Sequence, residues 1–161
     1  MNKSCLYVVA TPIGNLQDIS LRAIETLKKV NLIICEDTRQ TKKLLNFLKI
    51  SKPLISFHGY SSSQKVETLL KKIKTEKEVA LVSDNGTPGI SDPGFALTSA
   101  AQNEGIKIIP IPGASAFLTA LQASGSPINQ FLYLGFLPIK KGRKKCLNNF
   151  SIENKTIVFY E

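Results

Sequence analysis

Three loops rich in glycine, proline and small polar residues carry the residues best suited to hold a ligand in this 161-residue chain. They cover 11–15, 83–94 and 110–116, and each adjoins a short apolar run typical of a buried strand. Small residues let a backbone approach a ligand closely, and glycine permits positive φ. Turns and helix caps would explain any one of these loops, but three at one edge of one sheet favour a binding site.

The loop at 83–94 is the longest of the three. It holds three glycines, two prolines and two carboxylates within twelve residues, whereas a plain connection between strand and helix takes about 2–6 residues. Neither G-x-x-x-x-G-K-[ST] nor G-x-G-x-x-G occurs after the first strand, and Pro12 lacks the N–H that a pyrophosphate loop would use. These features disfavour a dinucleotide dehydrogenase and a nucleoside triphosphatase.

Four carboxylates and the single histidine are candidates for accepting a proton at the same edge of the sheet. They are Glu36, Asp37, Asp84, Asp92 and His58. Asp37 is the preferred catalytic candidate because it directly follows the second apolar run, although Asp is also a favoured helix N-cap and we place that interpretation first. Arg39 fits an RNA phosphate contact and an ion pair with Asp37 or Glu36 equally well.

The chain is basic, with 21 Lys and Arg against 12 Asp and Glu and a formal charge of +9. This charge favours a polyanionic partner, although solubility alone would also explain it. The densest basic segment suits the backbone of RNA or a solvated helix face. Its members are Lys140, Lys141, Arg143, Lys144 and Lys145.

Cysteine and histidine are too few and too scattered for a metal site or a disulfide framework. Three cysteines show no C-x-x-C spacing, and His58 is the only histidine. No apolar run approaches the roughly 20 residues that span a membrane. We therefore predict no metal, no membrane partner and a cytoplasmic protein.

Short apolar runs alternate with amphipathic stretches along the chain. The runs lie at 6–10, 32–35, 53–57, 79–83 and 106–111. This alternation predicts an α/β fold, an open parallel sheet with helices on both faces. The Ser-Gly-Ser-Pro segment at 124–127 predicts a boundary between a ligand-binding domain over 1–125 and the start of an incomplete α+β second domain over 126–161, with strands near 131–136 and 156–160.

Five motifs occur in a characteristic order. They are Thr11-Pro12-Ile13-Gly14-Asn15, Glu36-Asp37-Thr38-Arg39, the loop at 83–94, Pro112-Gly113-Ala114-Ser115-Ala116 and Gly135-Phe136-Leu137-Pro138. In this order they resemble the ribosomal RNA small subunit cytidine 2′-O-methyltransferases, a branch of the tetrapyrrole methylase superfamily. The resemblance covers essentially the whole chain.

The resemblance implies two α/β domains with S-adenosylmethionine in the cleft between them, and a homodimer. It implies methyl transfer to the ribose 2′-hydroxyl of a cytidine in small subunit ribosomal RNA, as free RNA or in the 30S subunit. By analogy, the cofactor contacts would be Pro12, Ser83, Asp84, Asn85, Gly86, Thr87, Ser91, Pro112, Gly113, Ala114 and Ser115.

The chain departs from the family pattern in the 59–63 stretch after His58, in Asn85, where alanine is usual, and in length. Family members continue for roughly another hundred residues, so a fragment that folds or dimerises without catalysis is one alternative. A small-molecule methylase of the tetrapyrrole type is another, disfavoured by the Thr-Pro-Ile-Gly opening and the basic charge.

Overall fold

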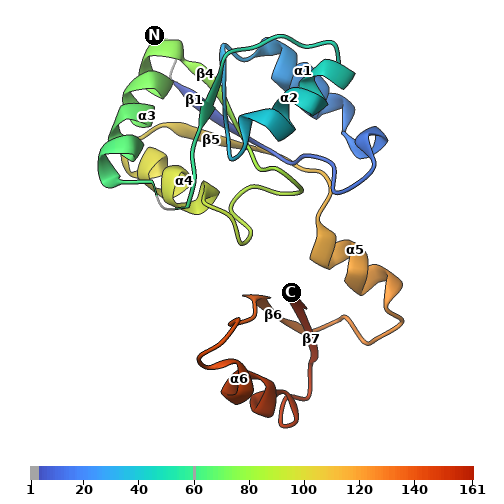
Figure 1. Ribbon diagram of the computed structural model, residues 1–161. Helices are drawn as coiled ribbons and strands as arrows, with labels where there is room; N and C mark the ends of the chain where they lie inside the picture. Colours follow the sequence, from blue (N-terminus) through green and yellow to red (C-terminus); the bar gives the residue numbers. More distant parts are fainter. Residues whose placement is uncertain (1–3, 60) are drawn as a thin grey trace. The chain divides into compact units, whose positions relative to one another are not determined.

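The computed structural model describes residues 4–59 and 61–161 and divides the chain into two compact units (Figure 1). The first unit ends at Ala114, and the second runs over Ser115–Glu161. Tyr60, in the stretch that departs from the family pattern, lies outside the described residues.

The first unit is built on a five-stranded parallel sheet with strand order β3-β2-β4-β1-β5. Its strands are β1 (Cys5–Val9), β2 (Leu32–Cys35), β3 (Leu54–Ser56), β4 (Glu78–Val82) and β5 (Lys107–Ile111). The helices are α1 (Leu21–Lys29), α2 (Thr38–Phe47), α3 (Ser63–Glu76) and α4 (Gly94–Asn103), with a short 3-10 turn, η1, at Leu16–Asp18. The predicted open parallel α/β fold is confirmed.

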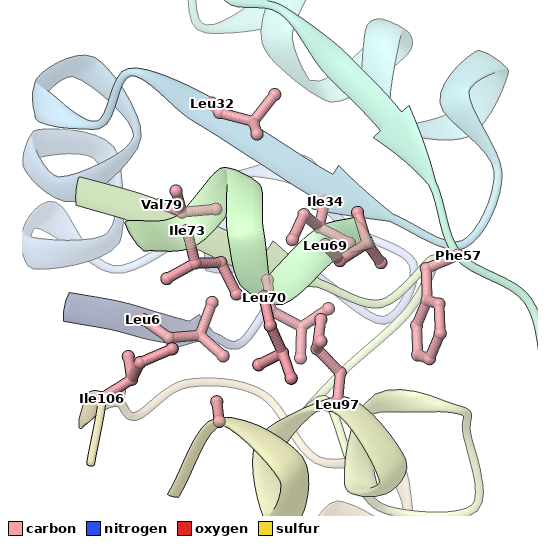
Figure 2. Packing of buried hydrophobic residues seen from close by; sticks show 12 residues of the cluster. Leu6, Leu32, Ile34, Phe57, Leu69, Leu70, Ile73, Val79, Leu97 and Ile106 are labelled. Carbon is pink, nitrogen blue, oxygen red and sulfur yellow. The ribbon is translucent and has the colours of Figure 1, made fainter. Parts of the chain in front are cut away.

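Helices cover both faces of this sheet because consecutive strand residues point to opposite sides. Ile33 packs with Leu27 of α1 and Leu45 of α2 in one buried cluster. Ile34 packs on the other face, in a cluster that includes residues of α3 and α4 (Figure 2). Since both faces are buried, the strands read as continuous apolar runs in the sequence.

Strands β1 and β4 are neighbours, but the helices that follow them, α1 and α4, pack on opposite faces of the sheet. The residues after β1 enter α1, which leads to β2, whereas the residues after β4 enter α4, which leads to β5 on the other side of β1 (Figure 1). A crevice forms at the carboxyl ends of two strands whose connections diverge in this way. The topology therefore points to the 11–15 and 83–94 loops as the binding edge.

The second unit contains α5 (Ala116–Ala123), β6 (Phe131–Phe136), α6 (Arg143–Phe150) and β7 (Thr156–Tyr160). Strands β6 and β7 pair in parallel, so the two strands expected near 131–136 and 156–160 are present. The ring of Phe117 in α5 stacks on Tyr133 of β6 at 4.6 Å between centroids. This packing groups α5 with the second unit, whereas the sequence analysis places that helix in the first domain.

Asp37 is the N-cap of α2, and that interpretation of the sequence is confirmed. Its Oδ1 accepts a hydrogen bond from the backbone N–H of Arg39 at 2.8 Å. The Arg39 guanidinium donates to both carboxylate oxygens, with Nη2 2.7 Å from Oδ2. These bonds from the Arg39 side chain and backbone lower the pKa of Asp37 to about 2.

This ion pair predicts an unusually acidic carboxyl. In a carbon-detected NMR titration, Asp37 should titrate near 2, and Arg39→Gln should move its pKa upward toward the ordinary value of about 3.9. Because the folded state favours the charged form, Asp37 stabilises the fold above about pH 4, and this contribution is lost as the pH falls toward 2. Glu104, whose pKa is lowered by Lys74, is the internal control and should not respond to Arg39→Gln. An ordinary pKa for Asp37 in the unsubstituted chain would contradict the prediction.

Candidate functional site

The loops after β1 and β4 are joined by a backbone bridge between Thr11 and Gly86. The N–H of Thr11 donates to the carbonyl of Gly86 at 2.8 Å, and the N–H of Gly86 donates back at 3.1 Å. The buried Thr11 hydroxyl also donates to the carbonyl of Ser83 at 3.1 Å. Thr11 therefore fixes the start of the 83–94 loop. The sequence names Thr11 only as part of the 11–15 motif and does not indicate this role.

Gly86 meets two requirements that other residues would not. Its φ is +86°, and a Cβ at this position would lie 3.3 Å from Cγ2 of Ile13. The Ser83 hydroxyl donates to the carbonyl of Gly86 at 3.0 Å, which closes the turn. A larger residue would be strained at this φ and would crowd the side chain of Ile13.

The loop after β5 joins the same edge. The Thr87 hydroxyl donates to the carbonyl of Ala114 at 3.1 Å, and a Cβ on Gly113 would lie 2.9 Å from the Cβ of Ala10. Ala10 directly follows β1, so three strand ends converge through backbone and small side chains. The first unit thus brings together most of the predicted cofactor residues. They are Pro12, Ser83, Asp84, Asn85, Gly86, Thr87, Pro112, Gly113 and Ala114.

Two predicted cofactor residues take part in none of the contacts described above. Ser91, with φ +60°, lies in the second half of the 83–94 loop, which Asp92 holds. Oδ1 of Asp92 accepts hydrogen bonds from the N–H groups of Gly89 and Gly94 at 2.6 and 2.8 Å. Ser115 is the first residue of the second unit and precedes α5.

Several backbone donors at this edge are available to a ligand. Within the described part of the chain, the N–H groups of Asn85, Thr87 and Gly113 donate to no protein acceptor. Asn85, Pro112 and Gly113 are exposed, whereas Ser83 and Gly86 are buried. The loops therefore present backbone groups on a rigid floor, which suits a ligand with several polar groups.

The candidate proton acceptors lie near one another but have different partners. Oδ1 of Asp84 accepts a hydrogen bond from the N–H of Asp37 at 2.9 Å. Glu36 and Asp92 line a small cavity of about 10 Å³ together with Ser83. Burial raises the pKa of Glu36, and the charges of Asp84 and Asp92 raise it further. His58 is exposed, and its backbone N–H donates to the Ser61 hydroxyl at 3.1 Å.

The basic segment of the second unit is open to solvent. Lys140, Lys141, Lys144 and Lys145 are exposed. Arg143 forms an ion pair with Glu161 instead. Arg39, the other predicted RNA contact, is exposed but bound to Asp37, as one of its two interpretations requires.

The described residues form neither a metal-binding cluster nor a membrane-spanning helix. Over 4–59 and 61–161, no three His, Cys, Asp or Glu side chains come together in a way that could hold a metal ion. No helix in the same residues is long and apolar enough to cross a membrane.

Known proteins resemble the chain in sequence and in fold. Ribosomal RNA small subunit methyltransferase I of Haemophilus influenzae is 49% identical over 157 residues, which cover 97% of this chain and 56% of that protein. The Thermotoga maritima protein of the same name is 47% identical over 156 residues, 97% of this chain and 70% of its own length. The chain thus spans little more than half the length of relatives such as the Haemophilus protein.

Solved structures share the fold at low sequence identity. Diphthine synthase matches with a TM-score of 0.70 and 16% identity over 97% of this chain and 64% of its own. Cobalt precorrin-4 methyltransferase matches with a TM-score of 0.68 and 16% identity over 98% of this chain and 68% of its own. The family model described as Tetrapyrrole (Corrin/Porphyrin) Methylases matches residues 5–161. The chain therefore belongs to the tetrapyrrole methylase family.

Proposed function

We propose that this chain is the cofactor-holding part of an S-adenosylmethionine-dependent methyltransferase that acts on small subunit ribosomal RNA. The acceptor is the ribose 2′-hydroxyl of a cytidine. The observation that carries the proposal is the convergence of three strand-end loops, joined by the Thr11–Gly86 bridge and the Thr87–Ala114 hydrogen bond. The names of the Haemophilus and Thermotoga relatives support the class of substrate.

The residues at this edge fit the chemistry of the cofactor. S-adenosylmethionine presents an adenine, ribose hydroxyls and an amino acid tail, and when bound it supplies an activated methyl group. The available N–H groups of Asn85, Thr87 and Gly113 are donors for its acceptor atoms. Ile13 and Pro112 provide apolar surface beside them. Close approach is possible because Gly86, Gly113 and Ala114 have no side chain beyond Cβ.

Methyl transfer to a ribose hydroxyl depends on alignment and on removal of a proton. Alignment within a rigid site supplies much of the acceleration in reactions of this type. The hydrogen bonds that join the loops reduce the freedom of the floor before any ligand binds. This chain's own contribution is therefore a rigid platform and a proton acceptor at the same edge.

The substrate side of the proposal rests on charge. A formal charge of +9 and four exposed lysines near α6 favour contacts with RNA phosphates. We propose ribosomal RNA or the 30S subunit as partner, a homodimer as the assembly and the cytoplasm as the location. The homodimer rests on the family resemblance.

Calorimetric titration with S-adenosylhomocysteine, the stable product, tests the cofactor site. We expect micromolar binding to the 161-residue chain and at least about a tenfold loss on Pro112→Arg, which costs about 1.4 kcal/mol. Pro53→Arg is the matched control, because Pro53 is also an exposed proline but precedes β3 at the opposite edge of the sheet. Absence of binding by the folded chain, or equal loss in both variants, would rule out this cofactor site and favour a fragment without catalysis.

A salt titration tests the RNA contacts. Substituting glutamine at Lys140, Lys141, Lys144 and Lys145 should lower the slope of log affinity against log salt for a small subunit RNA fragment by about 0.7 per lost phosphate contact. The control carries the same loss of charge at Lys42, Lys43, Lys71 and Lys72, which are exposed on α2 and α3. An equal slope change in both variants would show that net charge, rather than the basic segment, binds RNA.

A further inference from the structure

Hydrogen bonding separates the four carboxylates at the carboxyl edge of the sheet into two kinds. Asp37 caps α2 and binds Arg39. Asp84 accepts the backbone N–H of Asp37, and Asp92 accepts those of Gly89 and Gly94. Each of these three has a structural role, and protonating any of them would weaken a hydrogen bond that holds a loop or a helix end.

Glu36 is the fourth carboxylate, and it has no such role. Among residues 4–59 and 61–161, no group donates a hydrogen bond to its side chain. It is partly buried and lines the small cavity beside Ser83, the residue that opens the loop proposed to hold the cofactor. The cavity, about 10 Å³, has room for about one water molecule.

The surroundings of Glu36 favour its neutral form. Phe57, Pro88 and Pro93 supply apolar walls. The titratable neighbours of Glu36 are Asp84 and Asp92 from the loop after β4, Asp37 from its own segment and His58 from the loop after β3. Burial first, and then Asp84 and Asp92, raise its pKa; His58 lowers it, and Asp37 raises it. A carboxylate with a raised pKa takes up a proton more readily at neutral pH than Asp37 does.

We propose that Glu36, rather than Asp37, accepts the proton of the hydroxyl that is methylated; this rests on the proposed function. The O–H bond of the ribose 2′-hydroxyl breaks, and its proton moves to a carboxylate oxygen of Glu36. An O–CH₃ bond forms as the S–CH₃ bond breaks, and that electron pair stays on the sulfur, which becomes a neutral thioether. Glu36 then returns its proton to water.

The first measurement is the pKa of Glu36 itself in the ligand-free chain, by carbon-detected NMR. We expect Glu36 to titrate above the ordinary value of about 4.3 and Asp37 well below its own. Because the folded state disfavours the charged form, Glu36→Gln should stabilise the chain at neutral pH, and this gain should vanish as the pH falls below about 4. An ordinary or lowered pKa for Glu36 would overturn the proposal without any assay of methyl transfer.

The second measurement compares Glu36→Gln with Asp37→Asn in methyl transfer to small subunit ribosomal RNA. Asparagine is also a good N-cap, so Asp37→Asn keeps the helix start and is the matched control. We expect Glu36→Gln to lower the rate by about 100-fold or more and to remove the acidic limb of the pH profile. S-adenosylhomocysteine affinity should stay within about twofold in both variants, and Asp37→Asn should change the rate by less than about threefold.

The outcomes separate this proposal from the proposed function. An active chain whose Glu36→Gln variant keeps its rate and its pH profile would overturn the role of Glu36 alone. An inactive wild-type chain would overturn the proposed function, and the role of Glu36 with it. Loss of cofactor affinity in Glu36→Gln would assign the residue to binding rather than to proton transfer.

Discussion

The backbone bridge between Thr11 and Gly86 is the constraint on which the candidate site depends. It joins the ends of β1 and β4, two neighbouring strands whose chains diverge to opposite faces of the sheet. Without it, each loop would follow its own helix, and the crevice between them would have no fixed floor. The residue at position 86 has a positive φ, which favours glycine, and a Cβ there would crowd Ile13, so Gly86 serves the geometry of the bridge rather than its flexibility.

Burial on both faces of the sheet holds the two strands that the bridge joins. Leu6 of β1 and Leu81 of β4 lie in the cluster under α3 and α4, whereas Val9 and Val82 of the same strands lie in the cluster under α1 and α2. The buried Thr11 hydroxyl continues the same order into the loops by hydrogen bonding to Ser83. Packing within the sheet and hydrogen bonding at its carboxyl edge therefore act together. Both restrict the motion of the loops that we propose bind the ligand.

The fold could be predicted from the sequence because its strands are mostly apolar and alternate with amphipathic stretches. The grouping of α5 with the second unit could not be predicted from the sequence. It depends on the stacking of Phe117 on Tyr133, and no local sequence pattern indicates that these two residues are in contact. The loops were predictable as a set from their glycines and prolines. The importance of Thr11 was not predictable. A threonine beside a proline forms no distinctive sequence motif, and the role of Thr11 depends on the carbonyl to which its hydroxyl donates.

The contrast between Glu36 and Asp37 shows why neighbouring carboxylates need a structure to be told apart. Both follow β2, and consecutive residues at a strand end point in opposite directions. Asp37 turns to the start of α2, where a backbone N–H and a guanidinium stabilise its charge. Glu36 turns to the cavity beneath the 83–94 loop, where apolar walls and two other carboxylates oppose its charge. Two consecutive carboxylates thus differ in role: Asp37 is a helix cap, and Glu36 is the proposed base. The reason is that the partners of Asp37 favour the charged form, whereas the surroundings of Glu36 disfavour it.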